Sequence, residues 1–274
     1  MPLTTIYGDG NGTRVIGDST IIPQTIHPQV LSYINRLSAS GYIPSRNEID
    51  AVNNLIWSMV TLGIYAKCDL IYPVIGNSTA TVGFDLKNTF NATFSGSWTV
   101  TSTGMRPTTA NIANRANTTW NPNTNGNGTN DHLSIYLRTN QTAANVPIGC
   151  FDGNNLFQIN GSTTGNAIIN NTVSGIMSVT LASSTGFWIA SRISATNSRL
   201  YINGVVQGST SNNSPTRPNL PVSLGVRTTS GPNYDFPSSS EIALVSIGDG
   251  LTQDEVRHFN ILVQAYQLKL GRQI

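Results

Sequence analysis

Carboxylates that could work together in catalysis are sparse in this sequence. Glu241 is the one glutamate in the part of the chain that has β-type patterning, and it stands isolated between Ser240 and Ile242. Hydrolysis of a glycosidic bond needs two carboxylates, one as the acid and the other as the base or nucleophile. Because a single carboxylate cannot take both roles, we expect neither a glycoside hydrolase nor another enzyme.

Metal and cofactor motifs are also missing. His27, His132 and His258 lie far apart, and none stands at ligand spacing from a cysteine or from another histidine. The nucleophile elbow, the phosphate loop and the dinucleotide-binding glycine pattern do not occur in a suitable context. Asp131 and His132 fit a pair that satisfies local hydrogen bonds at the start of a strand better than they fit a catalytic site. We therefore expect no metal and no cofactor.

The stretch from 104 to 131 is rich in asparagine and glycine and predicts a long loop. Trp120 lies in this loop and is expected to be exposed, whereas Trp57 falls in a predicted helix, where a core position is expected. An exposed tryptophan can stack on a sugar ring while neighbouring polar groups bond the hydroxyls. Trp120, Asn130 and Asp131 are therefore the candidate glycan-binding residues. The alternative is that the tryptophan anchors the loop on its own domain or on a neighbouring copy.

Helical periodicity is confined to the two ends of the chain. Apolar residues at helical spacing from Pro28 predict a first helix that ends near Gly41. The capping-box pattern of residues 45–48 predicts a second helix, whose apolar stripe runs over residues 49–62. The same pattern at residues 252–255 predicts a C-terminal helix.

Between these helices the sequence pattern is typical of a β-sandwich. Short β-branched and aromatic runs recur about every 8 to 12 residues between turn-forming residues, and Thr81 to Asp85 is one such predicted strand. Asn203-Gly204 between two runs predicts a tight hairpin, because both residues accept positive φ. The predicted fold class is mainly β: a two-sheet antiparallel jelly-roll sandwich with two N-terminal helices and one C-terminal helix.

Three segments are predicted along the chain. Residues 1–26 form an extended N-terminal arm, residues 27–68 a helical lead-in, and residues 69–274 a jelly roll closed by the C-terminal helix. The arm is rich in glycine, threonine and aspartate and lacks helical periodicity.

The composition and charge pattern argue against membrane and nucleic-acid partners. Only 10% of the residues are charged and 38% are hydrophobic, with a net charge of +2, so the chain can bury a core and does not belong to the highly charged disordered class. No apolar run reaches about 20 residues, so we expect no membrane partner. No basic cluster interleaved with aromatic residues occurs, so we expect no nucleic-acid partner.

The surface composition is typical of an extracellular protein, yet the first cation is Arg14 and no export signal is evident. This combination indicates a protein that is assembled inside a cell and released by lysis. In a reducing compartment Cys68 and Cys150 are expected to be free thiols in apolar surroundings.

Several segments of the C-terminal half resemble known proteins. Those that resemble the closing strands of concanavalin A-like, laminin G-like jelly rolls are Arg199 to Gly204, Pro221 to Gly225 and Ile242 to Ile247. Those that are similar to a group of tailed-bacteriophage virion proteins with this lectin-like fold are Ser246 to Thr252, Val263 to Gln267, Leu270 to Ile274 and, upstream, Ile34 to Leu37 and Leu70 to Gly76. The resemblance extends over residues 30 to 274, and it rests on packing and turn residues.

The resemblance implies a structural component of a bacteriophage virion, assembled in the host cytoplasm. Such a protein decorates the head or tail as an oligomer, most simply a trimer, and is held among other virion proteins by its arm and helices. Tyr7, Ile34, Ile49 and Ile56 are the residues expected to contribute to oligomer or anchoring contacts. The alternatives are a receptor-binding adhesin that recognises host surface glycan through the sandwich, and a cellular lectin unrelated to any virus.

Overall fold

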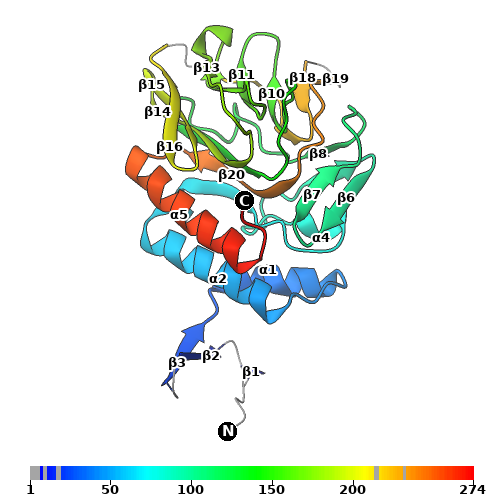
Figure 1. Ribbon diagram of the computed structural model, residues 1–274, viewed down its shortest axis with the longest axis vertical. Helices are drawn as coiled ribbons and strands as arrows, with labels where there is room; N and C mark the ends of the chain where they lie inside the picture. Colours follow the sequence, from blue (N-terminus) through cyan, green and yellow to red (C-terminus); the bar gives the residue numbers. More distant parts are fainter. Residues whose placement is uncertain (1–6, 9–10, 17–19, 213–215, 231–232) are drawn as a thin grey trace.

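A computed structural model describes most of the chain, with side chains from Thr25 onward. The described residues are 7–8, 11–16, 20–212, 216–230 and 233–274. Within them, two β-sheets pack face to face and a layer of helices covers one of the sheets (Figure 1). The predicted fold class, a mainly β sandwich with helices from both ends of the chain, is confirmed.

The sheet beneath the helices has eight strands among the described residues. In order across the sheet they are β16 (Val205–Thr210), β15 (Asn197–Ile202), β14 (Gly186–Ser194), β9 (Asp131–Leu137), β20 (Ile242–Asp249), β7 (Gly104–Pro107) and β6 (Trp98–Thr101), with β4 (Cys68–Tyr72) also paired to β20. Neighbouring strands run antiparallel. We call this the inner sheet.

The second sheet, here called the outer sheet, has nine strands in the described part of the chain. They are β13 (Met177–Ser178), β12 (Asn166–Asn171), β11 (Leu156–Asn160), β10 (Ile148–Phe151), β17 (Ser223–Leu224), β8 (Arg115–Asn117) and β5 (Thr93–Ser95), with β18 (Arg227–Thr229) paired to β10 and β19 (Asn233–Asp235) paired to β18. The β10–β18 pair is parallel and the other pairs are antiparallel.

The central strands of the inner sheet, β9, β14 and β20, are buried on both faces over most of their length. Along β9, Leu133, Ile135 and Leu137 pack into the core between the sheets, whereas Tyr136 packs into a second core beneath the helices. Along β14, Trp188 lies in the first core and Phe187 in the second. Side chains alternate between the two faces of a strand, so each central strand contributes to both cores.

Five α-helices lie among the described residues, and two of them begin at the predicted capping boxes. They are α1 (Pro28–Ala39), α2 (Arg46–Thr61), α3 (Ile64–Lys67), α4 (Thr79–Val82) and α5 (Gln253–Lys269), with a 3-10 turn at Val173–Gly175. Ser45 accepts a hydrogen bond from the Glu48 amide, and the Glu48 carboxylate accepts one from the Ser45 amide at 2.7 Å. Thr252 and Glu255 repeat this arrangement at the start of α5. Both predicted capping boxes are confirmed, and no helix among the described residues is long and apolar enough to span a bilayer.

Two expectations within the β region need correction. Residues 81–85, predicted as a strand, lie partly in α4, because Thr81 closes a turn with Ser78 through side-chain hydrogen bonds that compete with strand pairing. The stretch predicted as one long loop contains β7 and β8. The hairpin at Asn203-Gly204 is confirmed: φ is +49° and +77°, and Ile202 pairs with Val205.

Near the N-terminus, three strands form a separate sheet. They are β1 (Tyr7–Gly8), β2 (Asn11–Ile16) and β3 (Thr20–Thr25), with β2 paired antiparallel to both neighbours. The described backbone of the predicted arm is thus extended and paired with itself. The boundaries of the three predicted segments stay predictions.

Candidate functional site

Trp120 is buried, so the expectation that it is exposed was wrong. Its side chain has 0% exposure, and its ring lies 5.2 Å from that of Phe157 in the core between the sheets. The indole nitrogen donates to Asp69 at 3.0 Å, and the Trp120 carbonyl accepts from the Val222 amide at 2.9 Å. The asparagine-rich loop therefore folds back on its own sandwich, which is the alternative stated above. The ring is not available to a sugar.

The two neighbouring candidates lie at the end of the same loop. Asp131 is 1% exposed and Asn130 is half-buried. The Asp131 carboxylate accepts from the amides of Asn127 at 2.7 Å and Gly128 at 2.8 Å, and from the Asn170 side chain. Burial raises the pKa of the Asp131 carboxyl, while these hydrogen bonds act in the opposite direction. The carboxylate is used to close the loop onto β9 and β12.

His132 belongs to a buried polar network within the inner sheet. Its Nδ1 lies 2.6 Å from the Asp249 carbonyl oxygen, and its Nε2 lies 3.0 Å from the Ser246 hydroxyl, which is 2.6 Å from that of Ser134. A carbonyl oxygen can only accept, so Nδ1 carries the proton and Nε2 accepts from Ser246. Burial lowers the pKa of His132 to about 4. The pair Asp131-His132 satisfies local hydrogen bonds, as predicted.

The isolated glutamate and the two cysteines have structural surroundings rather than the surroundings of a reactive site. Glu241 accepts from the Thr103 hydroxyl at 2.6 Å and lies 3.5 Å from Arg138. Cys68 and Cys150 are free and buried, as predicted, and burial raises the pKa of Cys68 to about 12. No group of three or more histidine, cysteine, aspartate or glutamate side chains in the described part of the chain is arranged to hold a metal ion.

The residues predicted to make oligomer or anchoring contacts differ in their exposure to solvent. Ile56 is 0% exposed within the core beneath the helices, so its expected contact with another chain was wrong. Its position on α2 faces the inner sheet rather than solvent. Ile34 and Ile49 are half-buried and line a narrow gap between α1 and α2. The side chain of Tyr7 lies outside the described residues.

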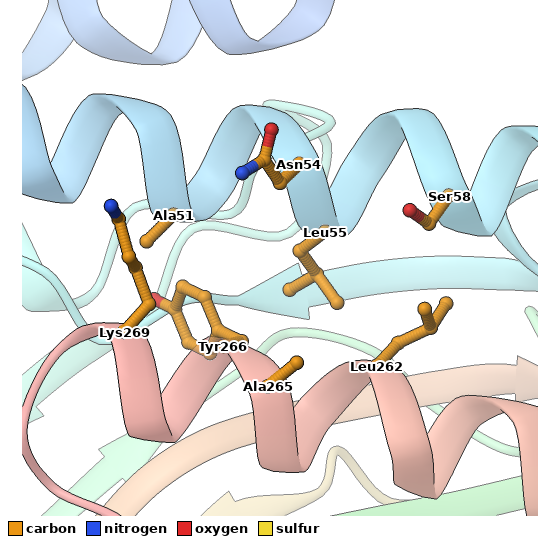
Figure 2. Close-up of a pocket in the computed structure, with 8 residues that line it drawn as sticks. All are labelled: Ala51, Asn54, Leu55, Ser58, Leu262, Ala265, Tyr266 and Lys269. Carbon is orange, nitrogen blue, oxygen red and sulfur yellow. The ribbon is translucent and has the colours of Figure 1, made fainter. Parts of the chain in front are cut away.

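An open apolar groove lies between α2 and α5, and the sequence pattern did not reveal it. Figure 2 shows Leu55 of α2 and, on the facing side, Leu262 and Tyr266 of α5. The cavity that they line has a volume of about 170 Å³. A second cavity of about 350 Å³ adjoins it, because Ser58 and Leu262 line both. Trp57, expected in the core, is 40% exposed at this second cavity. We call the two cavities the α2–α5 groove.

The groove lies next to the point where the N-terminal segment joins the helices. The Trp57 indole nitrogen donates to the Thr25 carbonyl at 3.0 Å, and the His27 ring packs edge-on to Trp57 at 5.0 Å. His27 in turn donates its amide proton to the Asn53 side chain at 2.8 Å. The end of β3 is therefore fastened to α2 beside the groove.

Of the comparisons with known proteins, only the one with solved structures found similar proteins. No family model matches the chain, and no curated protein matches it. Among solved structures, the binding domain of Paraclostridial Mosquitocidal Protein 1 is similar, with a TM-score of 0.50 and 12% identity over 71% of this chain. The sialidase of Trypanosoma rangeli is similar with a TM-score of 0.50 and 8% identity over 77% of this chain.

The matched parts are limited in extent. The chain covers 52% of the mosquitocidal binding domain, about half its length, and 38% of the sialidase chain. At these identities the likeness concerns the fold. The fold is a two-sheet β-sandwich with a layer of helices on one outer face.

Proposed function

We propose that this chain is a non-catalytic binding module that recognises a glycan on a host surface through its sandwich. The observation that carries the proposal is the one-sided placement of the helices, which cover the inner sheet and leave the outer sheet uncovered (Figure 1). At one end of the outer sheet, β5, β18 and β19 contain half-buried or exposed residues. One pole of the molecule thus suits attachment, and the opposite pole suits contact with a ligand.

Two further observations support a binding role. One of the similar structures is a binding domain, and the residue resemblance to virion proteins of lectin-like fold points to a particle that meets a host surface. Another similar structure is a sialidase, but the one glutamate in the β region of this chain is engaged in its own hydrogen bonds. Glu241, the residue weighed for glycan cleavage, is held by Thr103 and Arg138. A binding role needs no carboxylate pair.

Host-surface polysaccharide is expected to bind the purified chain saturably, with a micromolar to millimolar Kd, and without release of reducing sugar. Titration calorimetry and a reducing-sugar assay measure the two properties. The matched control is Val205→Ser, at a residue that is 60% exposed on the hairpin of the inner sheet, and this variant should bind the polysaccharide as the wild type does. Failure to bind across a broad glycan array, or release of sugar that Glu241→Gln abolishes, would contradict the proposal.

A second candidate function is a structural component of a tailed-bacteriophage virion, and the α2–α5 groove favours it. Single exposed apolar residues are ordinary, but here Trp57 and Leu62, each 40% exposed, line the same cavity of the groove. A homo-oligomer, most simply a trimer, or other virion proteins would cover this surface. The two functions are compatible, because a module fixed to a particle by its helices leaves its outer sheet free.

Trp57→Ser is expected to weaken self-association or particle binding about tenfold, because an aromatic side chain central to an interface typically contributes on the order of 1 to 2 kcal/mol. Sedimentation velocity across a concentration series measures the effect. Val205→Ser is the control, since Val205 is 60% exposed on the hairpin of the inner sheet. A wild type that remains monomeric at all concentrations, and that is absent from particles imaged by cryo-electron microscopy, would refute this second function.

A further inference from the structure

An arginine lies between two phenylalanine rings on the outer sheet. The guanidinium carbon of Arg227 is 4.9 Å from the ring centroid of Phe151 and 4.6 Å from that of Phe236. Arg227 comes from β18 and Phe151 from β10, the two strands that pair in parallel, whereas Phe236 directly follows β19. The parallel β10–β18 pair and the antiparallel β18–β19 pair thus bring the three side chains together.

The guanidinium is held in one orientation by polar partners. Its Nε and Nη2 donate to the two carboxylate oxygens of Asp235 at 2.8 and 2.6 Å, and its Nη1 donates to the Gln158 side-chain oxygen at 3.1 Å. The Asp235 side chain is 38% exposed and that of Arg227 is 12% exposed. A paired guanidinium fork of this kind is rigid. The carboxylate retains free lone pairs on its solvent side.

Phe236 has a backbone conformation that a bulky side chain rarely adopts. Its φ is +46°, in the left-handed region, and its side chain is 43% exposed. A glycine would adopt this backbone without steric cost, whereas in phenylalanine the Cβ makes the same backbone strained. The Phe236 carbonyl accepts from the Val146 amide at 3.0 Å, which fixes the turn. The strain is not needed to bury the residue, because Phe236 remains 43% exposed.

We infer that these residues form the subsite that holds one pyranose ring of the glycan, an inference that rests on the proposed function. The five residues of this Phe236 subsite are Phe151, Gln158, Arg227, Asp235 and Phe236. The exposed face of Phe236 suits the apolar C–H face of a sugar, and the Asp235 carboxylate suits a pair of adjacent hydroxyl groups. A fixed aromatic ring beside a fixed acceptor is a common way to orient a small polar ligand.

The charges of the subsite favour a neutral sugar over an acidic one. Arg227 and Asp235 form a paired fork, so their opposite charges compensate each other at the surface. A sugar carboxylate would meet the Asp235 carboxylate directly and would be repelled. The ligand class is therefore a neutral hexopyranose with vicinal hydroxyls.

The test uses the full chain and a panel of neutral methyl hexopyranosides, with the methyl glycoside of glucuronic acid for comparison, followed by saturation-transfer NMR and calorimetry. The wild type should bind at least one neutral glycoside at millimolar concentration and the acidic one more weakly. Phe236→Gly should lose at least tenfold in affinity while its melting temperature stays at or above that of the wild type, because the strain is relieved. Phe236→Asn, whose side chain tolerates left-handed backbone, is the second ring-removing variant should the first fold poorly.

The outcomes separate the two proposals. If the wild type binds glycan and either folded ring-removing variant binds it equally well, the subsite is overturned and the proposed function stands. If the wild type binds neither the glycosides nor host polysaccharide, both are overturned. Arg227→Lys keeps the positive charge but loses the fork, so it should also weaken binding. Val205→Ser, which removes an exposed apolar side chain from the inner-sheet hairpin, should leave sugar binding unchanged.

Discussion

Replacing Arg272 with methionine is expected to lower the free energy of unfolding by about 3 to 5 kcal/mol. Arg272 is 2% exposed although it lies three residues beyond α5. Its guanidinium donates to the carbonyls of Val74 at 2.9 Å, Pro73 at 2.9 Å and Ala243 at 3.0 Å, and to the Gln267 side chain at 2.6 Å. Methionine fills similar volume but leaves these acceptors buried without a donor.

The effect should exceed that of an ordinary arginine, because Arg272 fastens three distant segments. Val74 is a β-branched residue with φ of +55°, a conformation that persists only where its surroundings hold it. Arg257→Met is the matched control on α5, since Arg257 is 58% exposed and should change stability by less than about 0.5 kcal/mol. Urea unfolding of both variants measures the difference. A loss below about 1 kcal/mol for Arg272→Met would show that the carbonyls find other donors.

Acidification from pH 6.5 to 4 is expected to remove about 3 kcal/mol of stability through His132 alone. The pKa of His132 is lowered by burial from the ordinary value of 6.5 to about 4 in the folded chain. Between these values the unfolded chain binds a proton that the folded chain does not, so unfolding becomes more favourable as the pH falls. The contribution is fully present above pH 6.5 and is lost progressively toward pH 4.

This prediction is measured as the slope of unfolding free energy against pH. His132→Asn should be less stable than the wild type at neutral pH but should show a flatter slope between pH 6.5 and 4, because the group that titrates is gone. His258→Asn is the matched histidine control, since His258 is exposed on α5 and lies outside the buried polar network. Equal slopes for the wild type and His132→Asn would mean that the buried imidazole is not the group responsible.

Local sequence signals predicted much of this fold correctly. A capping box needs only a hydroxyl and a carboxylate three residues apart, and both predicted boxes, at Ser45 and Thr252, are present. The hairpin at Asn203-Gly204 depends only on two residues that accept positive φ. The sandwich itself followed from the spacing of the apolar runs.

Long-range contacts explain the expectations that were wrong. Trp120 was expected in solvent because its neighbours in sequence are polar, but its environment is set by Phe157 and Asp69 from other strands. Ile56 and Trp57 are adjacent on one amphipathic helix, and Ile56 packs into the core beneath the helices whereas Trp57 remains 40% exposed. A periodic pattern identifies the apolar side of a helix but not which part of it a neighbour covers.

The candidate subsite was not predictable for the same reason. Arg227, Gln158 and Phe151 are far apart in sequence, and they meet because β18 pairs in parallel with β10. No short motif encodes that pairing. The positive φ of Phe236 likewise depends on a long-range contact, the hydrogen bond from the Val146 amide to the Phe236 carbonyl. Position 236 is not a glycine or asparagine, so the residue type does not predict a left-handed backbone there.

Chemical-shift mapping of the isotope-labelled chain with a bound oligosaccharide tests the central claim most directly. The account predicts that the amides which shift on titration cluster on the outer sheet, over β10, β18 and the turn after β19, and that those of α2 and α5 do not shift. Shifts confined to the α2–α5 groove, or the absence of any saturable shift with host-surface glycan, would contradict the assignment of the sandwich as the ligand-binding pole.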